Sequence, residues 1–254
     1  MLFKDYLTYE EYSKNFFELL QLELFVIWKY CTINNETVKS IINQKLLLLK
    51  ISELFKNHES FINNLSTDAE MALSESVYRI DSALFINEFF EKIKSNIEDV
   101  LHHKYTTDIA TPAWCTFGCF SYEIFASDKN KIFLHIGNSA IPDSFLDDET
   151  LIKKSLLAVM DDAEKNHSIN TLTTETWLNS HEKWLRFFPD EWMSNMTAPT
   201  ADLVGHLGYW GQFINKKGCI NLKNASFFKE TGKLPYPVKR SFCSFDSLRK
   251  KLIE

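Results

Sequence analysis

The chain has 254 residues, of which 45% are hydrophobic and 14% aromatic. This length and composition fit one large domain or two small ones with a buried core, and they exclude a disordered chain. Because no run of about 18 apolar residues is free of charges, no membrane-spanning segment is expected. The net charge of −6 argues against general binding to nucleic acid.

The N-terminus and the cysteines both favour a cytoplasmic protein. The opening sequence MLFKDYLTYEEY lacks the basic start and the apolar run of a secretory signal. The five cysteines are odd in number and scattered, which is typical of reduced thiols rather than of a disulfide framework. Cys115 and Cys119 fall in a predicted strand, where they would lie about 13 Å apart, too far for a disulfide.

The first 105 residues are predicted to form packed helices. Neither Gly nor Pro occurs in this region, and both residues are unfavourable inside helices. Thr8 with Glu11, and Thr67 with Glu70, have the spacing of capping boxes and mark two expected helix starts.

One cluster of acidic residues and histidines lies near the end of this region, at Glu98, Asp99, His102 and His103. A carboxylate-bridged di-iron centre needs two Glu-x-x-His pairs, and the chain contains none. Histidine near a helix C-terminus is also favoured by the helix dipole. We therefore predict no metal site.

The remaining residues, 106–254, alternate between strand and helix patterns, and their order predicts a sheet of mixed direction. The expected fold class is α+β or α/β, with a helical N-terminal half (1–105) packed on a mixed-sheet C-terminal half. Strand patterns occur at residues 111–125, 131–136, 168–178, 202–215 and 238–244, and helical patterns at 142–167, 181–188, 221–232 and 245–253.

The stretch HLGYWGQFINKKG, residues 206–218, contains three of the seven glycines of the chain. In a strand, side chains alternate between the two faces, so His206, Trp210 and Gln212 would share one face. Gly208 would leave a gap beside the Trp ring, and such a gap can hold a small ligand. The alternative is that the glycines mark a bulge and that Trp210 is a core residue.

The predicted strand TLTTETW offers a second polar face, with Glu175 and Trp177 on it and Asn179 just beyond. A buried carboxylate is costly unless it is paired or used. Burial also raises its pKa, as a general base requires. The alternative is an edge strand with Glu175 in solvent.

In the hairpin predicted around residues 127–130, one register would set Glu123 opposite His135.

Residues 216–251 are strongly basic, with ten Lys and Arg residues against two acidic ones. This charge is typical of a solvated surface. The alternative is a docking surface for a phosphorylated small molecule, contacted by Lys216, Lys217 and Arg240.

The run KIFLHIGNSAIPDSFLDDETLIKKSLLAVMDDAEKN, followed by TLTTETWLNSHEKWLRFFP, resembles part of the GNAT superfamily of acyltransferases. Proteins of this superfamily have a hairpin, a helix, a strand and a further helix in this order. The resemblance covers about residues 112–190 and predicts a GNAT-like C-terminal half. The loop GNSAIPDSFLDD departs from the Gln/Arg-x-x-Gly-x-Gly/Ala pattern that holds the pyrophosphate of acyl-CoA in the family.

The resemblance implies transfer of an acyl group from a CoA-type or carrier-bound donor to a small amine or hydroxyl acceptor. Acyl-CoA would be a co-substrate, and no cofactor would be tightly bound. The expected roles are a general base at Glu175 or alternatively His206, pocket walls at Trp177, Tyr209 and Trp210, orienting amides at Asn179 and Gln212, and donor-phosphate contacts at Lys216, Lys217 and Arg240.

Two other classes of function remain open from the sequence. One is a non-catalytic module that binds a small ligand or another protein, with the helical half as the binding surface. The other is a metal-dependent enzyme that uses His135, Glu123 or His206. The sequence predicts neither a nucleic-acid nor a membrane partner, and it leaves the oligomeric state open.

Overall fold

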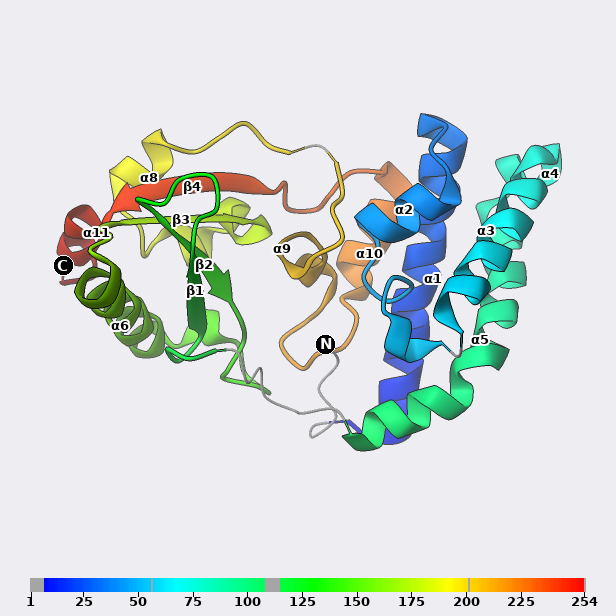
Figure 1. The fold of residues 1–254 in the computed structure, drawn as a ribbon, viewed down its shortest axis with the longest axis horizontal. Helices are drawn as coiled ribbons and strands as arrows, with labels where there is room; N and C mark the ends of the chain where they lie inside the picture. Colours follow the sequence, from blue (N-terminus) through cyan, green and yellow to red (C-terminus); the bar gives the residue numbers. More distant parts are fainter. Residues whose placement is uncertain (1–6, 56, 108–114, 201, 254) are drawn as a thin grey trace. The chain divides into compact units, whose positions relative to one another are not determined.

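The computed structural model describes residues 7–55, 57–107, 115–200 and 202–253 and has an α+β fold (Figure 1). The chain forms two compact units, which we call the helical unit and the sheet unit. The helical unit comprises Met1–Asp108 and Asp202–Pro235, and the sheet unit comprises Ile109–Ala201 and Tyr236–Glu254. The division expected at residue 105 placed segment 202–235 with the sheet, whereas the structure groups it with the N-terminal helices.

The N-terminal part of the helical unit contains α1 (Tyr9–Asn34), α2 (Val38–Lys45), a 3-10 turn (Ser52–Leu54), α3 (His58–Ser74), α4 (Ser76–Ile80) and α5 (Ser82–Thr107). Helix α1 begins at the predicted capping box. The Glu11 N–H donates to Thr8 Oγ1 at 3.2 Å, and the Thr8 N–H donates to Glu11 Oε2 at 2.8 Å. The second expected start is wrong, because Thr67 and Glu70 both lie inside α3.

Helices α1 and α5 pack against each other and form the main seam of the helical unit. On α5, apolar side chains repeat every four residues, which places them on one helix face. These side chains, all buried, are Phe85, Phe89, Ile93, Ile97 and Leu101. The long helices are therefore stabilised by burial of a shared apolar stripe.

A fully buried carboxylate ties α1 to the loop after α2. Glu23 Oε1 accepts hydrogen bonds from the N–H groups of Leu47 at 2.5 Å and Leu48 at 2.6 Å. Glu23 Oε2 accepts from the Leu49 N–H at 3.0 Å. Burial raises the pKa of Glu23 to about 7, although the three N–H donors oppose this rise. The loop thus depends on one acidic side chain for three of its backbone donors.

The strand expected at residues 202–215 is wrong. Leu207–Trp210 form the helical turn α9, Gly211–Phe213 form a 3-10 turn, and α10 (Leu222–Thr231) follows. Large aromatic side chains at positions 209, 210 and 213 are all buried. A strand would point neighbours 209 and 210 to opposite faces, whereas a helical turn lets all three pack into the core of the helical unit.

Close contacts hold this segment against the end of α2 and the loop that follows it. The Gly205 N–H donates to Gln44 O at 2.7 Å, and Lys50 Nζ donates to Gly205 O. A Cβ atom at position 205 would lie 2.5 Å from Leu46 O. Glycine is therefore required at 205 because two backbone segments approach each other there.

Within the described residues, the sheet unit contains one mixed sheet with the strand order β1-β2-β3-β4. The pairs β1–β2 and β3–β4 are antiparallel, and β2–β3 is parallel. A parallel pair needs a crossover, which α6 (Glu149–His167) provides. The mixed direction is as predicted. The strands are β1 (Phe120–Ile124), β2 (Ile132–Ile136), β3 (Thr171–Thr176) and β4 (Lys239–Ser244).

The inner face of the sheet packs against α6 and forms the core of this unit. Phe120, Leu134, Leu172 and Cys243 lie on this face and are buried. Shorter helices complete the unit: α7 (Glu182–Leu185), α8 (Asp190–Ser194) and α11 (Phe245–Ile253). Because paired residues of neighbouring strands share a face, the register also defines an outer face, which carries most of the charged side chains discussed below.

The predicted separation of Cys115 and Cys119 is wrong, because a turn precedes β1. The N–H of Phe117 donates to Phe120 O at 2.8 Å, so the chain reverses at Gly118, where φ is +62°. The thiol of Cys115 consequently donates to Cys119 O at 3.6 Å. All five cysteines are free.

In the described residues, no helix combines the length and the apolar character that a bilayer crossing needs.

Candidate functional site

The residues expected to form one pocket belong to two different units. They do not lie on adjacent strands, because residues 207–213 form helical turns and not a strand. The helical unit holds His206, Tyr209, Trp210, Gln212, Lys216 and Lys217, and the sheet unit holds Glu175, Trp177, Asn179 and Arg240.

The aromatic and amide residues of the 209–212 turn are parts of the core. Trp210 is 0% exposed, and its Nε1 donates to Lys45 O at 2.7 Å. Gln212 is also buried, and its Nε2 donates to Tyr209 O at 2.8 Å. Tyr209 is buried beside them. These side chains fasten the segment to the helical unit, which agrees with the alternative that Trp210 is a core residue.

His206 is the N-cap of α9 and is exposed. Its Nδ1 accepts a hydrogen bond from the Gly208 N–H at 3.1 Å. Its ring packs edge-on against Tyr209, with 4.8 Å between the centroids. The Nδ1 atom of His206 is therefore used to cap the helical turn that follows it.

Glu175 lies on the central strand β3, directly opposite Arg240 of β4. Arg240 Nε donates to Glu175 Oε2 at 2.9 Å, and Arg240 Nη2 donates to the same oxygen. The Glu175 side chain is 19% exposed. Of the two arrangements open from the sequence, the charge is therefore paired and the strand is not at an edge. The carboxylate that was expected to act as a general base is therefore engaged by the Arg240 guanidinium.

Asn179 stabilises the sheet unit from inside. It is fully buried, and its Nδ2 donates to Thr174 O at 3.2 Å and to Lys239 O at 2.8 Å. Its Oδ1 accepts from Trp184 Nε1 at 3.1 Å. Both ends of the amide are thus used in tertiary hydrogen bonds. Trp177 is half-buried and packs beside the ring of Tyr236, at 5.6 Å between centroids.

A contact between a carboxylate and a histidine also lies on the outer face of the sheet. Glu123 is opposite Phe133, and Ser121 is opposite His135, so the expected register is shifted by two residues. The Glu123 carboxylate nevertheless reaches His135 Nε2 diagonally at 3.6 Å. Since His135 and Glu175 each follow the parallel pair Phe133–Thr173 by two residues, both lie on this face.

The parallel strands β2 and β3 pair over two residues each, Ile132–Phe133 with Leu172–Thr173. Beyond this point the Thr174 hydroxyl donates to Leu134 O at 2.9 Å. The carboxyl ends of the two strands therefore leave the ladder early. In open α/β sheets, ligands bind beyond the carboxyl ends of the strands.

The nearby start of α6 is already occupied by carboxylates of the chain itself. Asp148 Oδ1 accepts from the Leu151 N–H at 2.9 Å, and Glu149 pairs with Lys153 at 3.0 Å. A helix N-terminus that is capped in this way is a poor site for a phosphate.

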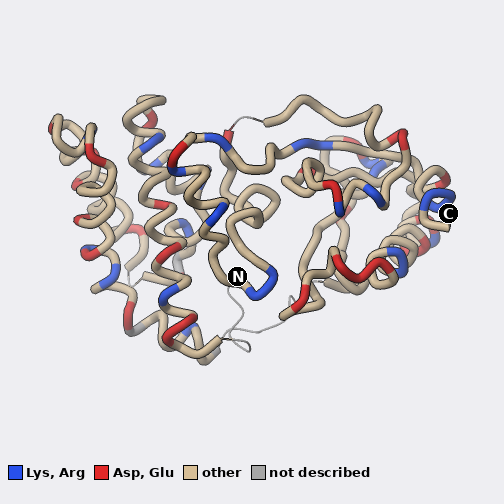
Figure 2. The backbone as a smooth tube through the Cα atoms, turned by 180° about the vertical axis from the view of Figure 1, so that it is seen from behind, with Lys and Arg blue, Asp and Glu red and all other residues tan. Residues whose placement is uncertain are grey.

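The strongly basic segment is divided between the two units. Lys216 to Lys233 belong to the helical unit, and Lys239 to Lys251 belong to the sheet unit. Basic and acidic residues are interspersed over both units (Figure 2). Arg249, for example, pairs with Glu164 and Asp161 at 2.7 and 2.8 Å. The Lys216–Lys217 pair lies in an exposed turn before Gly218.

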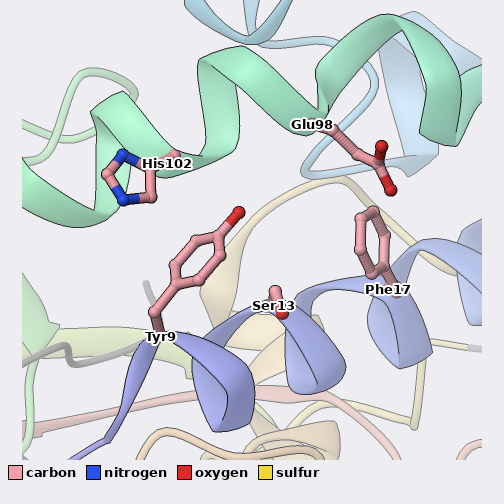
Figure 3. A pocket seen from close by; sticks show the side chains of 5 residues that line it. All are labelled: Tyr9, Ser13, Phe17, Glu98 and His102. Atoms are coloured by element: carbon pink, nitrogen blue, oxygen red, sulfur yellow. The ribbon is translucent and has the colours of Figure 1, made fainter.

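A groove of about 490 Å³ lies between α1 and α5 (Figure 3). It is lined by Tyr9, Ser13 and Phe17, one turn apart on α1, and by Glu98 and His102, one turn apart on α5. The rings of Tyr9 and His102 meet edge to face at 4.9 Å. Glu98 and His102 stand out in the sequence as part of the acidic and histidine cluster, whereas the lining residues of α1 were not predicted.

The C-terminal ends of α1 and α3, helix α4 and the start of α5 lie at one end of the helical unit (Figure 1). Large apolar side chains on these segments are exposed. We call this surface the apolar end. It was not predicted, because single apolar residues between polar ones are ordinary in a sequence. Its members are Ile33, Met71, Val77, Ile80 and Leu84.

Comparisons with protein-family models, with curated proteins and with solved structures find no match to this chain. Its class is defined by its fold: an α+β protein with an open mixed sheet and a separate helical unit. No group of three or more His, Cys, Asp and Glu side chains able to hold a metal occurs among the residues that the structure describes.

Proposed function

We propose that this protein is a non-catalytic binding module that engages another protein through the apolar end. The observation that carries the proposal is the exposure of five large apolar side chains on neighbouring helix ends, with Ile80 at 82% and Ile33 at 67%. Gathered apolar groups on a surface mark sites of protein contact. The free cysteines support a reducing, cytoplasmic location as part of this proposal.

The contacts of the expected catalytic residues also support a binding role. Asn179 and Gln212 are buried, and their side-chain amide nitrogens donate hydrogen bonds to main-chain carbonyls. Arg240, expected to meet a donor phosphate, is engaged by Glu175. The contacts of these polar side chains stabilise the two units, so their presence does not require a catalytic role.

The proposal is tested by placing a photo-reactive benzophenone amino acid at Ile80 and, as a matched control, at the equally exposed Ile253 of α11. A partner cross-linked from position 80 alone would be identified and purified, and its binding measured by calorimetry. We expect Ile80→Asp to weaken binding about tenfold, which is about 1.4 kcal/mol. Unchanged binding by Ile80→Asp would overturn the proposal.

Acyl transfer is the second candidate. It is supported by one observation, the position of Glu175 and His135 on one face at the early-diverging carboxyl ends of β2 and β3. If acetyl-CoA binds, a concentration of about 100 times its Kd should add about 2.7 kcal/mol to the free energy of unfolding. We expect no such gain, and Glu175→Gln should leave partner binding unchanged. Acetyl-CoA turnover that is lost in Glu175→Gln would establish the enzyme instead.

A further inference from the structure

We propose that the apolar end docks a basic amphipathic helix of a partner protein. This inference rests on the proposed function and adds the chemistry of the partner. It follows from how α4 is anchored, from the exposed side chains around it and from the charge of the surrounding helices.

Helix α4 is anchored by one side and presents the other. The Tyr78 carbonyl accepts from Trp28 Nε1 at 2.8 Å, and the Tyr78 hydroxyl donates to Glu88. These contacts join α4 to α1 and α5. Val77 and Ile80, three residues apart and hence neighbours on the helix surface, are exposed. The short helix is therefore held in place while its two aliphatic side chains remain exposed.

The other members of the apolar end lie on α1, α3 and α5, each of which contacts α4. Arg79 Nη2 donates to Thr32 O at 3.5 Å, which brings the end of α1 and its exposed Ile33 beside α4. The carbonyl of Met71 accepts from Ser74 Oγ at 2.6 Å. The N–H of Leu84 donates to Asp81 Oδ1 at 3.1 Å. These hydrogen bonds fix the backbone at Met71 and Leu84 and next to Ile33, so the exposed apolar side chains lie on ordered helix ends.

The chain segment that carries four of these side chains is acidic. Residues 68–91 contain six acidic residues and one basic residue, Arg79. Lys92, next in the chain, pairs with Asp68 at 3.8 Å and Glu88 at 3.2 Å. Glu75 and Asp81, exposed at the two ends of α4, keep the rim negative.

This charge decides which occupant fits. A second copy of the chain would bring two acidic rims together, and like charges across an interface disfavour association. A helix with apolar residues at positions i, i+3, i+4 and i+7 and with Lys or Arg beside them would match both the apolar centre and the acidic rim. Such a helix could lie across α4 between the ends of α1 and α5.

The test uses the full chain and two fluorescent amphipathic peptides of about 18 residues with the same Leu pattern. One peptide carries Lys and Arg on its polar face, and the other carries Glu there. We expect fluorescence anisotropy to show that the basic peptide binds and that the acidic one does not. Ile80→Asp should weaken binding about tenfold. Ile253→Asp, with an equally exposed isoleucine, should bind as the wild type does.

The outcomes separate this inference from the proposed function. Equal binding of both peptides, lost in Ile80→Asp, would overturn the basic partner but leave the docking role. Equal binding of the basic peptide by wild type and Ile80→Asp would overturn the site. A wild-type dimer in sedimentation that Ile80→Asp dissociates would show that the occupant is a second copy. Circular dichroism of each variant confirms folding, as expected for a change at a side chain that is 82% exposed.

Discussion

Replacing Glu23 by glutamine changes one buried acceptor into a donor. The new amide's carbonyl oxygen can keep the two bonds from Leu47 and Leu48, made at 2.5 and 2.6 Å in the wild type. Its nitrogen would then face the N–H of Leu49, which donates to the other Glu23 oxygen at 3.0 Å. A buried donor without a partner costs about 1–3 kcal/mol, so the variant should lose about this much stability at low pH.

The pH dependence of this loss follows from the raised pKa of Glu23, about 7 in the folded state against the ordinary 4.5. The folded state binds the proton more tightly, so the wild-type free energy of unfolding falls as pH rises from 4.5 to 7. A shift of this size corresponds to about 3 kcal/mol. A glutamine side chain does not ionise, so raising the pH from about 5 to about 8 should shift the stability difference by about 3 kcal/mol in favour of Glu23→Gln. The wild-type advantage of about 1–3 kcal/mol at low pH should therefore disappear or reverse at pH 8.

Urea unfolding of both proteins at about pH 5 and pH 8 measures this gap directly. Glu91→Gln is the matched control, because Glu91 lies exposed on α5 and its substitution should change neither value. A gap between wild type and Glu23→Gln that is the same at both pH values would refute the reasoning, because it would mean that burial does not raise the pKa of Glu23.

Two further predictions concern packing in each unit. Gly205→Ala should lower the free energy of unfolding by about 1–3 kcal/mol, because its Cβ would lie 2.5 Å from Leu46 O; an unchanged urea midpoint would contradict this close approach. Asn179→Ala should cost about 2–4 kcal/mol, because it leaves Trp184 Nε1 without its buried partner and removes both bonds from Nδ2. Asn179→Asp retains an acceptor for Trp184 but turns its second oxygen toward the carbonyls of Thr174 and Lys239, so its thermal stability should be no higher than that of Asn179→Ala; a melting temperature near that of the wild type would show that the Nδ2 bonds contribute nothing.

Local patterns were sufficient for features whose partners are near in sequence. The capping box of Thr8 and Glu11 spans three residues, and it predicts the start of α1. The hairpin, the crossover helix and the last strand are visible as a change of hydrophobic period, and they predict a sheet of mixed direction. The end of α10 is also local, because Gly232 adopts φ +68° just after the helix.

The candidate site depended on partners that lie far apart in the chain. Glu175 could be read as a base, a solvated charge or a paired charge, and Arg240, 65 residues later, decides for the pair. The Glu123–His135 contact was anticipated only approximately, because a register shift of two residues preserves the face but moves the partner. The groove of Tyr9 and His102 needs two helices whose packing no single helix pattern specifies.

The structure of the segment around Trp210 could not be predicted from its local sequence pattern. Over about seven residues, the same pattern of apolar and polar residues fits either a strand or a helical turn, so hydrophobic period alone does not distinguish them. The choice follows from contacts with residues far earlier in the chain, including the Trp210 bond to Lys45 O, 165 positions away, and the approach of Gly205 to Leu46. Short-range stereochemistry thus specifies where helices and strands begin, whereas burial and long-range hydrogen bonds, which need the folded chain, select among the arrangements that those patterns allow.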